Sequence, residues 1–213
     1  MTKPFSEACL RNQQPIADAL QSLLPTVANV LEIGSGTGQH AVFCAQALPH
    51  IKWQTSDLPQ HHAGMLKWIE DAALDNVLPP LVLDVDQPWP DFSVAPISHA
   101  FKVTDVFTAN TVHFIAWESV VNMFIKVSVL LPDKGLFVIY GPVNVAGQFT
   151  SEGNAGLDEW LKSCVNPLAG IKDIADIEQL ARDQGLALID NLAMPANNRL
   201  LVLQKQSLFI TAT

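Results

Sequence analysis

One stretch of the sequence decides the fold: Val30–Leu31–Glu32–Ile33–Gly34–Ser35–Gly36–Thr37–Gly38. The apolar run before the first glycine predicts a buried strand, and three glycines at alternate positions predict a tight turn into a helix. Glycine lets a ligand lie against bare backbone, and a helix start presents free N–H groups and the positive end of its dipole. The stretch therefore predicts a ligand-binding loop between a strand and a helix.

The spacing within this loop separates three kinds of ligand. A mononucleotide-binding P-loop needs a lysine after its last glycine, where this chain has Gln39. The dinucleotide fingerprint G-x-G-x-x-G fails as well, because its third glycine would fall on the same residue. Glu32 would repel a pyrophosphate and suits a cationic ligand. The remaining pattern, E-x-G-x-G-x-G, resembles motif I of class I S-adenosylmethionine-dependent methyltransferases, whose cofactor carries an ammonium and a sulfonium group.

Acidic residues follow the next two predicted strands. Asp57 directly follows the predicted strand Ile51–Ser56, and in related dinucleotide folds such an acid accepts both ribose hydroxyls. The resemblance implies that Asp84, in the third strand, contacts the adenine amino group. Either acid could instead cap a helix. We expect S-adenosyl-L-methionine to be held by Glu32, Gly34, Ser35, Gly36, Gly38, Asp57, Asp84 and Asn110.

Short β-branched runs alternate with helical patterns along the chain, which predicts an α/β domain with a parallel sheet. We expect one domain, 1–213, with an N-terminal helical segment, 1–26, and an irregular segment, 143–172, that acts as a substrate lid or insertion. The predicted strands are Val27–Ile33, Ile51–Ser56, Leu81–Val85, Val103–Ala109, Leu136–Tyr140, Leu186–Leu192 and Leu200–Gln204. The predicted helices are Ile16–Leu24, Gly38–Leu48, Gln60–Ala73, Trp117–Leu131, a short one around Leu157–Cys164, and Ile174–Gln184.

The chain also resembles a narrower group, a domain of unknown function called methyltransferase-like 26 in animals. The resemblance rests on Arg11–Asn12, Pro15–Ile16, residues 31–40, Trp53–Gln54, Ser56–Asp57, Asn110, His113, Trp117, Tyr140–Gly141–Pro142, Phe149–Thr150–Ser151, Asn154 and residues 194–198. It implies a Rossmann-like class I methyltransferase fold: a mostly parallel seven-stranded sheet, helices on both faces and an antiparallel C-terminal strand. The chain departs from the group at Leu157, where Phe is favoured, and at Lys172, where Arg is favoured. Lysine lacks the planar fork that binds a carboxylate through two parallel hydrogen bonds.

Methyl transfer needs alignment of donor and acceptor, and a base where the acceptor carries a proton. Active sites of open α/β sheets lie beyond the carboxyl ends of the strands. The candidate catalytic residues are therefore His113, Tyr140 and Asn110, with His113 as base or acceptor-binding group. His113 could equally be structural, and Tyr140 a core aromatic. The substrate-binding candidates are Trp117, Asn154, Asn197 and Asn198, although Trp117 fits a core and the last two fit a turn.

Charge, hydropathy and cysteine content limit the classes of partner and the cellular compartment that fit this sequence. Twelve Lys and Arg against 21 Asp and Glu give a net charge of −9, so we expect no nucleic acid partner. The longest apolar stretch, Val120–Leu131, is interrupted and far shorter than a membrane span. Three widely spaced cysteines form neither a disulfide framework nor a zinc pattern, and the chain begins without an apolar leader, which favours the cytoplasm. His61–His62 has no third metal ligand in the sequence, and His40 either lines the cofactor site or faces solvent.

These features lead to a cytoplasmic methyltransferase that uses S-adenosyl-L-methionine and acts on a small-molecule acceptor. One alternative is a non-catalytic protein that binds this cofactor as a sensor or scaffold. A second is a nicotinamide-dependent oxidoreductase, against which Glu32 and Gln39 argue. The acceptor and the oligomeric state are left open by the sequence.

Overall fold

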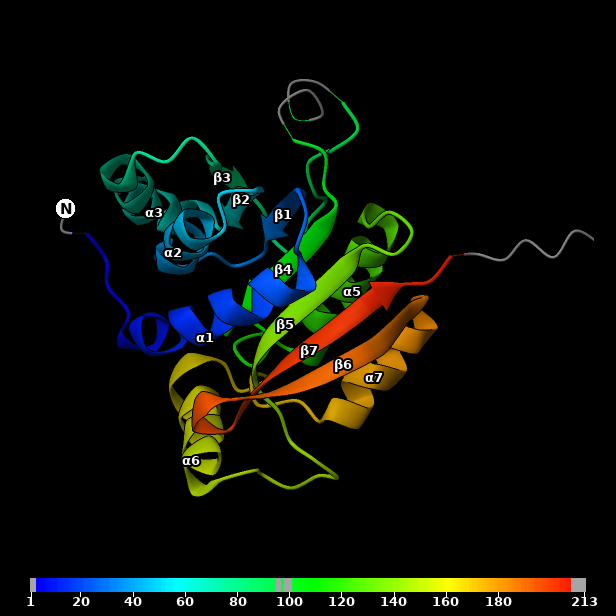
Figure 1. Ribbon diagram of the computed structural model, residues 1–213. Coiled ribbons are helices and arrows are strands. Elements are labelled where there is room, and N and C mark those ends of the chain that lie inside the picture. The colour runs from blue at the N-terminus through cyan, green and yellow to red at the C-terminus, as the bar shows by residue number, and fades with distance from the viewer. Residues whose placement is uncertain (1–2, 95–96, 98–100, 208–213) are drawn as a thin grey trace, which may run out of the picture.

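The computed structural model describes residues 3–94, 97 and 101–207. Within these residues, seven strands form one sheet in the order β3-β2-β1-β4-β5-β7-β6 (Figure 1). The strands are β1 Ala28–Glu32, β2 Ile51–Asp57, β3 Val77–Val82, β4 Asp105–Ala109, β5 Leu136–Pro142, β6 Leu186–Met194 and β7 Asn198–Lys205. Neighbouring strands from β3 to β5 pair in parallel, whereas β7 is antiparallel to both β5 and β6. The expected mostly parallel sheet with an antiparallel C-terminal strand is confirmed.

Helices cover both faces of the sheet, because strand side chains alternate between two apolar layers. One layer packs α1 (Glu7–Leu23), α2 (Gln39–Ala47) and α3 (Pro59–Ala72) against strand residues such as Val30 and Phe107. The other packs α5 (Trp117–Leu130) and α7 (Ile174–Asp183) against residues such as Leu31 and Phe137. Figure 1 shows the first group in front of the sheet and the second behind it.

Two predicted elements have different boundaries. The first helix begins at Glu7 rather than Ile16, because the Ser6 side chain caps it by accepting from the Cys9 N–H; Pro15 therefore lies inside the helix. The third strand is Val77–Val82 rather than Leu81–Val85. It includes Pro79 and Pro80, which have no N–H to donate. These prolines are tolerated because β3 is an edge strand.

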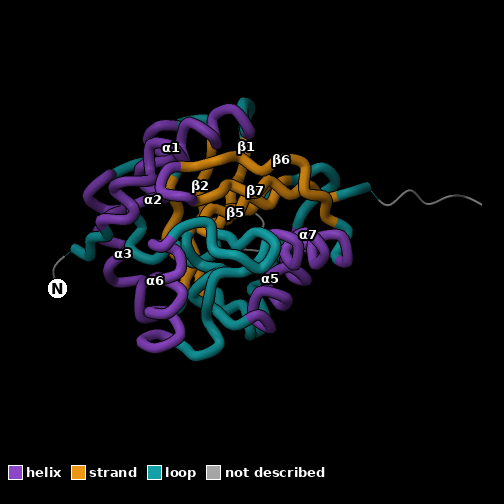
Figure 2. The backbone as a smooth tube through the Cα atoms, turned by 90° about the horizontal axis from the view of Figure 1, so that it is seen from below, coloured by secondary structure: helices purple, strands orange, loops and turns teal. Residues whose placement is uncertain are grey.

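The segment 143–172 contains more helix than expected. Helix α6 spans Glu152–Trp160, where the Ser151 hydroxyl caps it by accepting from the Asn154 N–H, and it continues into a π-helical turn, Leu161–Val165. Viewed from below, α6 and neighbouring loops lie in front of the strands (Figure 2). The start of α6 thereby adds walls to the cavity described next.

Candidate active site

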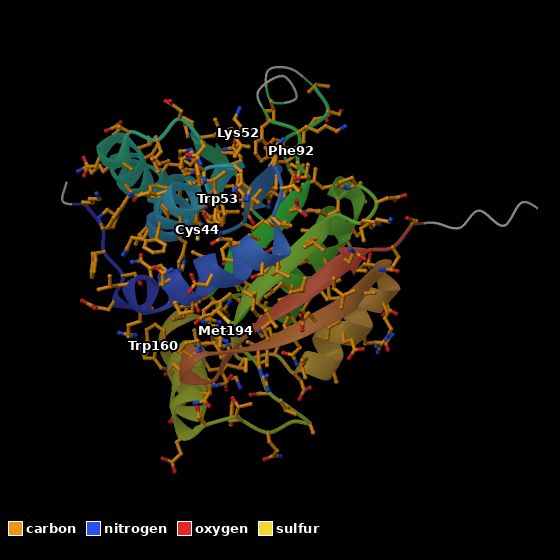
Figure 3. All side chains as sticks on the ribbon, viewed as in Figure 1. Cys44, Lys52, Trp53, Phe92, Trp160 and Met194 are labelled. Atoms are coloured by element: carbon orange, nitrogen blue, oxygen red, sulfur yellow. The ribbon has the colours of Figure 1, made fainter. Side chains whose placement is uncertain are left out.

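A cavity of about 1050 Å³ lies at the carboxyl ends of β1, β4 and β5. Its walls come from five parts of the chain: the start of α1, the glycine loop, the segment after β4, the end of β5 with the start of α6, and the turn between β6 and β7. The lining residues include Ser6, Cys9, Arg11, Asn12, Gly34, Ser35, Gly36, Thr37, His40, Asn110, Thr111, His113, Phe114, Tyr140, Pro142, Asn154, Leu157, Asn197 and Asn198. In Figure 3 the labelled Trp160 and Met194 mark the α6 and β6 sides of this end of the molecule.

The three glycines of the loop have different surroundings. All have positive φ, which favours glycine, but a Cβ on Gly34 would meet the Thr111 Oγ1 at 2.6 Å and one on Gly38 would meet the Met65 Cγ at 2.8 Å. A Cβ on Gly36 would meet nothing within 4 Å. Gly34 and Gly36 line the cavity, whereas Gly38 caps α2 and packs against α3. The bare backbone open to a ligand is therefore that of Gly36.

The two predicted carboxylates after β2 and β3 lie outside the cavity wall. Asp57 holds the glycine loop, because its carboxylate accepts the N–H groups of Gly36 and Leu58, each at 2.7 Å. Asp84 accepts the N–H of Asp86 at 2.9 Å, two residues beyond the end of β3. Asp57 thus contacts the same glycine that faces the cavity, while Asp84 lies in a turn.

Glu32 ends β1 just before the glycine loop and is 1% exposed. It accepts a hydrogen bond of 3.0 Å from the indole N–H of Trp53, which is buried in the layer that packs α2 against the sheet (Figure 3). Burial, the largest cause, raises the pKa of the Glu32 carboxyl to about 7. Its charge therefore changes near neutral pH, and Glu32 is not part of the cavity wall.

His113 is 4% exposed and faces the cavity from the segment that follows β4. Burial, with a smaller effect from the positive charge of Lys172, lowers its pKa to about 4, so the imidazole is neutral at pH 7. Its ring packs against Phe114 at 4.9 Å, and among the described residues no hydrogen bond reaches either ring nitrogen. Among the described residues, Asn144 Oδ1 is the one fully buried side-chain nitrogen or oxygen atom without a partner, so the ring nitrogens of His113 are open to the cavity, where a bound molecule or water can bond to them.

A chain of polar contacts joins α1 to the ends of β5 and β7. His40 donates from Nε2 to the Asn12 Oδ1 at 2.6 Å, and its Nδ1 lies 3.8 Å from the Cys9 Sγ. Burial lowers the pKa of His40 to about 4, so this ring is also neutral. Burial raises the pKa of the Tyr140 hydroxyl, whereas the nearby side chains of Asn12 and Asn198 act to lower it.

The structure brings together most of the other predicted side chains. Asn154, Asn197 and Asn198 line the cavity with Asn110, whose φ is +56° and whose N–H donates to the Tyr140 carbonyl at 2.9 Å. Trp117 is not in the cavity wall; it begins α5 and packs against the apolar core.

Sequence reasoning missed the contribution of α1 to this cavity. Cys9, Arg11 and Asn12 all line the cavity. They were not predicted as site residues, because the search considered segments that follow strands, and the first helix was expected to begin only at Ile16. A signal was available in Ser6 and Glu7, which are typical of a helix start at this position.

A metal centre finds no support in the part of the chain that the structure describes, where no three His, Cys, Asp or Glu residues gather as metal ligands. His61 and His62 lie at the start of α3, and the His62 ring bonds to the Asp57 backbone oxygen at 2.9 Å. Over the same described residues, no helix has the length and apolarity needed to cross a membrane.

A family model described as a protein of unknown function (DUF938) matches residues 3–205. The chain belongs to this DUF938 family. Its fold is shared by solved methyltransferases. Mitomycin 7-O-methyltransferase MmcR superposes with a TM-score of 0.77 at 14% identity, over 93% of this chain and 54% of that one. An O-methyltransferase family 2 protein from Planctomyces limnophilus, in complex with apigenin, superposes with a TM-score of 0.77 at 16% identity, over 93% of this chain and 58% of that one.

A third solved relative was determined with ligands. The O-methyltransferase NcsB1 of neocarzinostatin biosynthesis, in complex with S-adenosylmethionine and 2-hydroxy-5-methyl naphthoic acid, gives a TM-score of 0.67 at 14% identity, over 91% of this chain and 56% of that one. The DUF938 chain therefore spans a little over half the length of these relatives. At these identities the likeness establishes the class I methyltransferase fold.

Proposed function

We propose that this DUF938 protein is an S-adenosyl-L-methionine-dependent methyltransferase that acts on a hydroxyl group of a small molecule. One observation carries the proposal: a neutral, buried His113 without a protein partner faces a cavity that also exposes the backbone of Gly36. The methyltransferase fold and the O-methyltransferase names of its solved relatives support it. The segments shared with the methyltransferase-like 26 group support a common function for the two.

The residues of the glycine-loop side fit the cofactor. Gly36 offers open backbone, Asp57 fixes that backbone, and Glu32 places a partly ionised carboxyl just before the glycine loop, which suits a ligand with an ammonium and a sulfonium group. A volume of about 1050 Å³ exceeds the usual size of a single ligand site and leaves room for a second, small molecule. When bound, the cofactor supplies a methyl group activated by its positive sulfur.

The side chains on the β4 and β5 side would hold and deprotonate the acceptor. His113, neutral at pH 7, would accept the hydroxyl proton of the acceptor as the oxygen reacts. Asn110 and Tyr140 would orient the acceptor from the ends of β4 and β5, and Asn154, Asn197 and Asn198 would border it. We further propose that the segment 143–172 acts as a lid over the acceptor, and that the protein, with free cysteines at 9, 44 and 164, works in the cytoplasm.

Calorimetry with the purified protein tests the cofactor. We expect S-adenosylmethionine and S-adenosylhomocysteine to bind with micromolar affinity and NADH not to bind; a protein that binds only NADH would contradict the proposal. Asp57→Ala should weaken binding of S-adenosylhomocysteine about tenfold or more, because the Gly36 backbone loses its support. Unchanged affinity would remove Asp57 from the site.

Methyl transfer to a panel of small hydroxylated compounds then tests catalysis. His113→Ala should lower turnover about a hundredfold while the affinity for S-adenosylhomocysteine stays within about twofold of wild type. Equal turnover would remove His113 from the chemistry, and cofactor binding without transfer to any acceptor would favour a sensor.

A further inference from the structure

We propose that the acceptor is an anion, a small hydroxylated carboxylic acid whose carboxylate is bound by Arg11 at the Tyr140 side of the cavity. This inference rests on the proposed function and names the class of its substrate. It is carried by the charges of the cavity wall and by where they lie in the fold.

Arg11 is the single charged side chain among the described residues of the cavity wall. It is exposed, and within the described part of the chain no carboxylate forms an ion pair with it; Glu7, one turn earlier on α1, is not within ion-pair distance. An arginine presents five N–H donors in a planar fork that matches a carboxylate. An unpaired guanidinium in the wall of a ligand cavity therefore indicates an anionic ligand.

The acidic composition of the chain makes a positively charged cavity wall unusual, and therefore informative about the ligand. Acidic residues outnumber basic ones by 21 to 12, yet no Asp or Glu belongs to the described cavity wall. Asp57 has both oxygens engaged with backbone N–H groups, and Glu32 is 1% exposed and lies outside the cavity wall. An anion that enters the cavity meets a positive charge and amide or hydroxyl groups, without a facing carboxylate.

The position of Arg11 assigns the carboxylate to the acceptor rather than to the cofactor. Arg11 lines the cavity together with Tyr140 of β5 and Asn198 of β7, and its positive charge acts to lower the pKa of the Tyr140 hydroxyl. The sheet order places β5 and β7 on the far side of β4 from the glycine loop after β1 and from Asp57 after β2. Arg11, Tyr140 and Asn198 thus form a carboxylate subsite on the acceptor half.

The remaining unpartnered groups suit the reacting end of such an acid. The His113 ring has no hydrogen-bond partner in the described structure, and Phe114, Pro142 and Leu157 line the same cavity as apolar walls. A molecule with a carboxylate at one end and a hydroxyl at the other would satisfy both Arg11 and His113.

Binding of acids and of their uncharged amides tests the subsite. The protein is saturated with S-adenosylhomocysteine and titrated with 3-hydroxybenzoate, 4-hydroxybenzoate and 3-phenyllactate, each compared with its carboxamide. We expect at least one acid to bind about tenfold or more tightly than its amide. Arg11→Gln should reduce this preference below about threefold, and Arg11→Lys should keep part of it, because the charge remains but the fork is lost.

Arg182→Gln is the matched control, because Arg182 pairs with Glu178 on α7 and lies outside the cavity wall. It should keep the full preference. Three results would overturn the proposal: acids and amides that bind wild type equally, a preference that survives Arg11→Gln, or an Arg11→Gln variant that loses affinity for S-adenosylhomocysteine instead. If wild type fails to bind S-adenosylhomocysteine, the proposed function is contradicted. In that case the same titrations with acids and amides, done without S-adenosylhomocysteine, still test whether Arg11 binds a carboxylate.

Discussion

Glu32 shows how one buried carboxyl ties the glycine loop to the stability of the fold. Its pKa is raised to about 7 in the folded chain, against an ordinary value of 4.5, because burial disfavours the charged form. The folded state therefore holds this proton more tightly than the unfolded state. The resulting stabilisation is complete below pH 4.5 and is lost as the pH rises through 7, and it amounts to about 3 kcal/mol.

Glu32→Gln should remove this loss while keeping an oxygen that can accept from the Trp53 indole. The free energy of unfolding of the variant, relative to wild type, should rise by about 3 kcal/mol between pH 4.5 and pH 8. Urea denaturation at several pH values measures this difference, in which the contributions of the buried histidines cancel. Glu70→Gln, on the exposed surface of α3, is the control and should follow the wild-type curve. Parallel curves for Glu32→Gln and wild type would contradict the prediction.

At the same scale, the sequence indicates residue chemistry better than residue surroundings. Polar residues after strands can be recognised from the pattern, and Asn110 and His113 do line the cavity. The role of Asp57 as a hydrogen-bond partner of the Gly36 backbone depends on how β1 and β2 are aligned in the sheet, which local patterns do not encode. The unpaired state of Arg11 is likewise a property of the packed chain.

Among the elements, the segment 170–172 matters because it docks onto the segment that carries His113. The Gly170 N–H donates to the His113 carbonyl at 2.9 Å, and the Lys172 Nζ donates to the Ile115 carbonyl at 2.8 Å. The buried Asp158 of α6 accepts the Ile171 N–H at 2.7 Å, which ties this end of the proposed lid to its helix α6. The ammonium of Lys172 therefore lies close enough to oppose protonation of His113.

Lys172→Gln should move the pKa of His113 upward toward its ordinary value of 6.5, since one of the two causes of its depression is removed. If the neutral ring is the active form, kcat/KM of wild type should fall only as the pH approaches about 4, and in the variant this fall should begin at a higher pH. An NMR titration of the His113 ring measures the same shift independently of activity. Lys102→Gln, at the opposite end of β4, is the control, and an unmoved His113 titration in Lys172→Gln would contradict the prediction.

The two boundaries that differ most from the prediction have different causes, one local and one tertiary. A proline at position 15 suggests a helix start, yet the side chain of Ser6 caps the helix much earlier. The prolines of β3 argue against a strand, but the Gln54 and Thr55 side chains donate to the Pro79 and Leu78 carbonyls and hold the edge in place. Ser6 is a local signal that the proline outweighed in the prediction, whereas the partners of β3 lie on β2 and could not be identified from the β3 segment itself.

For the whole molecule, the alternation of strands and helices was sufficient to predict the sheet, but the cavity was harder to predict. Its walls join α1, which begins at Glu7, to the turn that ends at Asn198, and Asn12, Tyr140 and Asn198 all line it. Segments so far apart in the sequence meet only because β5 pairs with β7 and α1 packs across the same face. A ligand in this cavity should therefore stabilise the chain from both ends.

S-adenosylhomocysteine at about 100 times its dissociation constant should stabilise the folded state by about 2.7 kcal/mol, which corresponds to a rise in Tm of about 5–10 °C. Because the cavity is built from distant segments, amide hydrogen exchange should slow in residues 6–12 of α1 as well as in 34–37 of the glycine loop. The amides of α7, outside the cavity wall, should change only as much as global stability requires. Protection confined to the glycine loop would contradict this prediction. It would show that the ligand does not contact α1, although Cys9, Arg11 and Asn12 line the cavity.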